Sequence, residues 1–169
     1  MGLLIAVLAM LMLVGSFMWM RPSARDQFLA KLRFQALMSG FRISSLKIPN
    51  TTELGRIDDS KEIVTIYVKN LALVKTPTQP YTVIRTTGEA GIYLPEGWQW
   101  HERVGLSESL MHSIAAFVDT LPLSVTVVSV DITQAAISWD EKDPSITFER
   151  LSNWLTAAAK LINRKIHGE

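Results

Sequence analysis

The chain has 169 residues, of which 48% are hydrophobic and 20% are charged, and its formal net charge is +1. It contains no cysteine, which excludes disulfides, zinc sites built on thiolates and cysteine nucleophiles. Residues 21–50 carry six basic side chains and one acidic side chain, whereas residues 51–169 carry 11 basic and 15 acidic side chains. The mildly acidic C-terminal region argues against nucleic acid as a partner.

Residues 2–20 form a run of nineteen residues without a charged side chain, closed by Arg21 and Arg25. A helix needs about 20 apolar residues to cross a hydrocarbon core of about 30 Å, and Trp19 stands where an indole favours the membrane interface. A cleavable signal peptide is the alternative, but no basic residue precedes the run and bulky residues occupy the expected cleavage position. We therefore predict a retained transmembrane helix at residues 2–20.

A basic juxtamembrane helix is expected at residues 21–40, with Gly40 as its stop. It carries the basic collar, which comprises Arg21, Arg25, Lys31 and Arg33. Because Lys and Arg accumulate on the cytoplasmic side of a membrane helix, the N-terminus is expected outside and the C-terminal domain in the cytoplasm. The opposite orientation is the alternative. The collar also suits anionic lipid headgroups, although a role as topology signal alone is the favoured interpretation.

The segment Met-Arg-Pro-Ser-Ala-Arg at residues 20–25, followed by Lys31, Leu32 and the stop at Gly40, resembles the start of YajC-type proteins. These are accessory proteins of the bacterial Sec translocon, so the resemblance implies an inner-membrane anchor and a cytoplasmic basic helix. It ends after about 40 residues, because the chain lacks the glycine-rich β domain that follows in that family. The whole chain also resembles a group of proteobacterial single-pass membrane proteins, at residues 121–125 and 139–141. Neither resemblance transfers a site residue.

Residues 41–169 are predicted to form one soluble α+β domain. Strand patterns occur at residues 41–48, 64–68, 81–86, 123–130 and 135–139, with an additional short strand considered at residues 92–94. Residues 64–68 alternate apolar and polar side chains, which is typical of a half-buried strand. The last two strands are expected to pair as a hairpin that turns near residues 131–133.

Two amphipathic helices complete the predicted domain. Apolar residues recur every three or four positions over residues 106–121, with Ser107 as the N-cap, and again over residues 148–162. Asp143 is expected to cap the second helix and Pro144 to occupy its first turn. Strands mixed with two such helices predict an α+β fold in which the helices cover one face of a mainly antiparallel sheet.

Residues 98–102, Trp-Gln-Trp-His-Glu, bring together two indoles, an imidazole and a carboxylate. We predict an interaction patch at Trp98, Trp100 and His101, because exposed aromatic side chains anchor interfaces. The alternative is a loop whose tryptophans fill the core. No histidine stands at metal-ligand spacing and no catalytic motif is present, so we predict no catalytic, cofactor-binding or metal-binding residue.

The sequence therefore predicts a non-enzymatic, single-pass protein of a bacterial inner membrane. Its cytoplasmic domain would act as an adaptor or accessory subunit of a membrane complex, including one related to translocation. The expected partners are membrane lipid and a membrane protein. A membrane-tethered domain that binds a small ligand or a lipid is the alternative.

Overall fold

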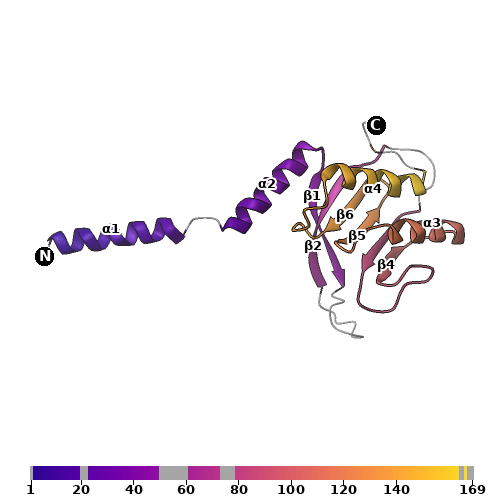
Figure 1. Cartoon of the computed structure of the whole chain (residues 1–169), viewed down its shortest axis with the longest axis horizontal. Coiled ribbons are helices and arrows are strands. Elements are labelled where there is room, and N and C mark those ends of the chain that lie inside the picture. The colour runs from indigo at the N-terminus through magenta and orange to yellow at the C-terminus, as the bar shows by residue number, and fades with distance from the viewer. Residues whose placement is uncertain (1, 20–22, 50–60, 73–78, 164–165, 167–169) are drawn as a thin grey trace. The chain divides into compact units, whose positions relative to one another are not determined.

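The computed structural model describes residues 2–19, 23–49, 61–72, 79–163 and 166 (Figure 1). The elements are α1 (Gly2–Trp19), α2 (Ala24–Met38), β1 (Arg42–Pro49), β2 (Lys61–Asn70), β3 (Tyr81–Arg85), β4 (Trp98–Arg103), α3 (Glu108–Asp119), β5 (Val125–Val130), β6 (Gln134–Trp139) and α4 (Phe148–Leu161). The chain divides into two compact units, residues 1–35 and 36–169. The predicted α+β class is confirmed.

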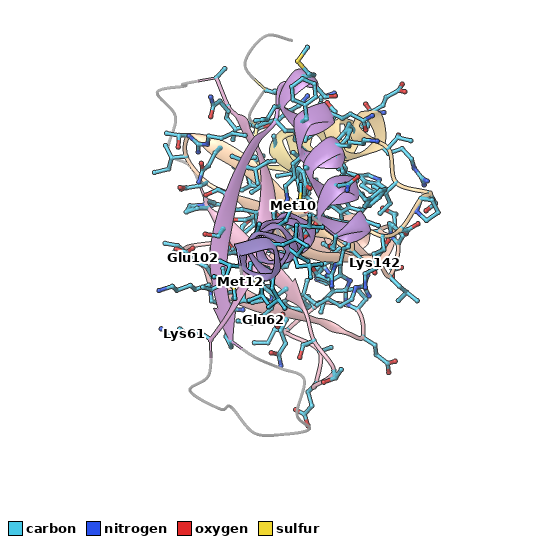
Figure 2. The ribbon with its side chains drawn as sticks, turned by 90° about the vertical axis from the view of Figure 1, so that its left-hand side faces the viewer. Met10, Met12, Lys61, Glu62, Glu102 and Lys142 are labelled. Carbon is cyan, nitrogen blue, oxygen red and sulfur yellow. The ribbon has the colours of Figure 1, made fainter. Side chains whose placement is uncertain are left out.

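In the N-terminal unit, the apolar side chains of α1 that the structure describes are exposed, including Met10 and Met12, which are labelled in Figure 2. Within the described parts of the chain, no helix is both long enough and apolar enough to cross a membrane. The transmembrane helix expected at residues 2–20 thus has no support from the fold and stays a prediction.

Helix α2 falls inside the region expected to be helical, and its ends follow from local hydrogen bonds. Ser23 and Asp26 exchange hydrogen bonds at the start, because each backbone N–H donates to the side chain of the other. The hydrogen bonds from Ser23 lower the pKa of Asp26. Gly40 takes a left-handed φ of 77° after the helix, and the backbone N–H of Phe41 donates to the carbonyl oxygen of Ala36.

The domain is built on one six-stranded antiparallel sheet with the order β1-β2-β6-β5-β3-β4. The expected strands and the β5–β6 hairpin are confirmed. Two expectations are wrong: residues 92–94 form a turn, and residues 98–103, considered as a loop, form the edge strand β4.

One face of the sheet packs against helices, as expected: α4 contacts β5, β6 and α3 (Figure 1). Tyr81 is fully buried here, and its hydroxyl donates to the carbonyl oxygen of Ala158 on α4 at 3.3 Å. Burial raises the pKa of Tyr81 because the phenolate would have no water around it. This hydrogen bond ties the centre of the sheet to the helix that covers it.

The opposite face is buried by curling of the sheet. Ile48 of β1 belongs to a buried cluster with Val127 of β5 and Ile84 of β3. Strands β1 and β5 are three positions apart in the sheet, which is about 14 Å for a flat sheet. Contact across the cluster therefore requires that the β1–β2 hairpin bend over this face, and Leu46 and Val64 fill the space at the cluster's border.

The start of α4 differs from the prediction. Thr147 is the N-cap, because its side chain accepts a hydrogen bond from the backbone N–H of Arg150 at 3.3 Å. Asp143 instead accepts from the backbone N–H of Ser145 at 2.9 Å and so closes a turn four residues earlier. The cap predicted at Asp143 is therefore wrong. The cap predicted at Ser107 is confirmed, since its side chain accepts a hydrogen bond from the backbone N–H of Leu110 at the start of α3.

We expect the Asp143→Asn variant to show a weaker loss of stability in acid than the wild type. Interaction with the hydroxyl of Ser124, and then with Ser145, holds the pKa of Asp143 below its ordinary value of 3.8. A carboxyl group whose pKa is lowered by folding stabilises the folded state fully above its unfolded-state pKa. This contribution is lost as the pH falls through the folded-state pKa. Urea unfolding of the full chain in detergent, measured from about pH 6 to about pH 2.5, tests this. Ser145→Ala should change the slope in the same direction, and equal slopes for all three proteins would contradict the assignment.

Candidate functional site

A shallow, open cleft with a volume of about 400 Å³ lies beside β4. It is lined by Gly91, Ile92, Gln99, Trp100, His101 and Arg103. Two of the three residues predicted to form an interaction patch, Trp100 and His101, therefore lie together at this cleft. The sequence did not indicate Arg103, because a regular strand would place it on the face opposite to Trp100.

A β-bulge in the β3–β4 pair determines which side chains share the cleft. The register pairs Trp100 with Val83, Glu102 with Thr82 and Arg103 with Tyr81. His101 is left as the extra residue of β4. In a regular strand, residues three apart point to opposite faces, but the extra residue brings Trp100 and Arg103 onto the same face. The bulge therefore assembles the indole and the guanidinium on one side of the sheet edge.

Trp98 has a structural role instead of belonging to the patch. It is only 1% exposed, and the guanidinium of Arg85 lies over its ring at 4.5 Å. Arg85 also donates to the carbonyl oxygens of Val125 at 2.9 Å and Pro122 at 3.1 Å. Partial burial lowers the pKa of Arg85. Trp98 thus matches the alternative considered for it, a tryptophan that fills the core.

The loop before β4 forms one wall of the cleft. The backbone N–H of Gly91 donates to the carbonyl oxygen of Trp98 at 2.8 Å, and the indole N–H of Trp100 donates to the carbonyl oxygen of Ile92 at 3.0 Å. A Cβ on Gly91 would lie 2.9 Å from Cδ1 of Trp100. Glycine is therefore required at this position for the loop to approach the indole so closely.

Helix α3 fixes the same loop through Tyr93. The backbone of Tyr93 has a φ of 65°, which is uncommon for a residue with a side chain. Its hydroxyl donates to Glu108 at 2.8 Å, and its ring centroid lies 4.4 Å from that of His112. The hydrogen bond to Glu108 raises the pKa of Tyr93. These contacts of the side chain compensate the unfavourable backbone and hold the wall in place.

The cleft combines positive charge with apolar surface. The described residues that line it include Arg103 and His101, both exposed, and none of these described residues is a carboxylate. Ile92, Tyr93 and Val104 are 59%, 44% and 55% exposed and extend the apolar surface around it. Within the described residues, no three histidine, aspartate or glutamate side chains come together as metal ligands do. The arrangement is suited to binding an anionic group next to an apolar one.

Comparison with protein-family models, curated proteins and solved structures finds no match to the chain. The resemblance to YajC-type proteins therefore stays a prediction. Function has to be inferred from the chemistry of the site, because a fold alone does not determine it.

We expect Gly91→Ala to displace the indole of Trp100 and to destabilise the domain by about 1–3 kcal/mol through overpacking. The new Cβ would clash with Cδ1 of Trp100 and lie 3.2 Å from its backbone nitrogen. Gly88→Ala is the matched control, because its nearest contact would be an ordinary 3.5 Å to Thr86. Urea unfolding and the indole N–H resonance of Trp100 report the two effects. Equal shifts in both variants would contradict the close packing at Gly91.

Proposed function

We propose that the chain is a non-enzymatic, membrane-anchored adaptor whose α+β domain holds a protein partner at the β4 cleft. The observation that carries the proposal is the bulge, which gathers Trp100, His101 and Arg103 at an exposed sheet edge. Tryptophan, tyrosine and arginine side chains are the groups that contribute most to protein interfaces, and Trp100 is half-buried while Arg103 is exposed. Ile92 and Val104 supply the apolar surface around them.

The proposed anchor rests on the complete run of residues 2–20, which contains no charge. Apolar side chains lie on all sides of α1, and those described are exposed. A helix that is apolar all round needs apolar surroundings on every side, which a lipid bilayer provides. The exposed collar residues Arg25 and Lys31 support a cytoplasmic domain at a bacterial inner membrane, while Arg33 is half-buried and Arg21 lies outside the described residues.

The cleft at His101 also favours a second candidate function, which is the capture of a small ligand or a lipid by the tethered domain. Sites for small ligands usually enclose most of the ligand surface. This cleft is shallow and open, and exposed apolar side chains continue beyond it. A larger partner that covers both the cleft and its surroundings is therefore the better fit.

We expect the N-terminus to lie outside the cell and the domain in the cytoplasm. The absence of cysteine allows one reactive thiol to be introduced at a time. In intact bacteria, a membrane-impermeant maleimide should label Gly2→Cys but not Lys142→Cys, which should react only after lysis. Lys142 is exposed in the turn after β6, so its protection would reflect the membrane (Figure 2). Labelling of Lys142→Cys in intact cells would reverse the orientation, and release of the chain by alkaline carbonate would contradict the anchor.

We expect a photo-reactive amino acid at Val104 to cross-link the chain to a partner protein in cells. Val104 is 55% exposed and directly follows Arg103, which ends β4 and lines the cleft. The same group at Lys142 is the control and should give no such product. Combining the Val104 probe with Arg103→Gln should reduce the yield of the adduct. An identical pattern of products from the two positions would contradict a specific surface at β4.

A further inference from the structure

Arg103 and His101 have hydrogen-bonding capacity to spare in the cleft. Arg103 carries five N–H donors, and its contact with the sulfur of Met111 is long, at 3.8 Å. His101, the extra residue of the bulge, is exposed and lies between Trp100 and Arg103 along the strand. A planar carboxylate matches the fork of a guanidinium and binds it through two hydrogen bonds.

Trp100 indicates that the ligand also carries an apolar group. Its indole N–H is already bonded to the carbonyl oxygen of Ile92, so the ring offers a face and not a donor. The exposed side chain of Ile92 lies at the same cleft. The group that fits here is apolar, and the carboxylate would follow within a few ångströms along β4.

The position on the sheet determines the form of the ligand. Strand β4 ends the strand order and pairs, among the described strands, only with β3. Beyond Trp98, whose carbonyl oxygen already accepts from the N–H of Gly91, such an edge accepts an extended peptide. Peptide side chains two residues apart share a face and can meet the apolar and the cationic subsites together. Glu102 follows His101 on the strand and faces the side of Thr82, and residues 51–169 carry a formal charge of −4. A single carboxylate meets less repulsion from this charge than a phosphate dianion.

We propose that the cleft binds an extended acidic segment of a partner protein, with a carboxylate at Arg103 and His101 and an apolar side chain against Trp100 and Ile92. This inference rests on the proposed function, because that function assigns the cleft to a protein partner. The bulge is then a recognition device: it brings the cationic and apolar subsites to one face of the edge strand.

A labelled, end-capped peptide in which valine and glutamate stand two residues apart, with threonine between them, tests the inference by fluorescence anisotropy with the full chain in detergent, because residues two apart share a face of an extended peptide. We expect it to bind, and we expect the same peptide with glutamine in place of glutamate to bind about tenfold more weakly. Arg103→Gln should weaken the glutamate peptide by a similar factor and leave the glutamine peptide unaffected. The matched control, Lys142→Gln, removes an exposed cation outside the cleft and should change neither affinity.

Trp100→Phe and His101→Gln provide further variants that keep the side chains large and the strand intact. We expect each to weaken the glutamate peptide severalfold. Equal affinity for the two peptides, or equal effects of Arg103→Gln and Lys142→Gln, would overturn the inference. Binding of free 4-phenylbutyrate as tight as that of the peptide would overturn the peptide as the occupant. If Val104 cross-links to a partner but the peptides do not bind as expected, the adaptor function is retained and only the acidic segment is rejected. If neither experiment gives the expected result, the proposed function is also rejected.

Discussion

The domain depends on the burial of both faces of a single antiparallel sheet, only one of which is covered by helices in the described part of the chain. Helices α3 and α4 cover one face, and the hydrogen bond from Tyr81 to Ala158 ties that face to α4. The other face has to bury Ile48, Ile84 and Val127 by curvature, since these side chains come from strands that would be far apart in a flat sheet. Curvature therefore substitutes for a second helical layer, and it is compatible with the pronounced twist of antiparallel strands.

The two outer strands of this sheet have different roles. Strand β1 bends inward, and Ile48 joins the buried cluster of the curled face. Strand β4 stays at the edge and contains the bulge at His101, which interrupts regular pairing and so also protects the edge from uncontrolled association. The same irregularity that limits unspecific strand pairing gathers Trp100 and Arg103 on one face. Protection of the edge and the shared face of Trp100 and Arg103 are thus two consequences of one inserted residue.

The spacing of apolar side chains predicted the helices and strands that pack regularly. It did not predict the elements in which this spacing is interrupted. Helix α3, with its cap at Ser107, and the β5–β6 hairpin were predictable because their apolar side chains repeat at helical or strand spacing. Strand β4 was not, because its charged second half and its bulge remove the alternation that identifies a strand. Asp143 and Thr147 are both good caps by residue type, and only the turn closed by Asp143 decides between them. Two residues of the cleft, Trp100 and His101, could be predicted from the sequence. The contribution of Arg103 could be recognised only from the register of the β3–β4 pair.

The order of the strands gives the adaptor proposal a geometric basis. The chain enters the domain at Phe41, which is 3% exposed and packs against Tyr67 and Phe148 with ring centroids 6.4 and 5.8 Å apart. It then continues directly into β1, the first strand in the sheet order, whereas the cleft lies on β4, the last. The entry of the chain into the sheet and the cleft are therefore at opposite ends of the strand order. A partner that paired with β4 would leave the buried aromatic contacts of Phe41 intact, because these contacts involve Tyr67 and Phe148 and not the edge strand β4.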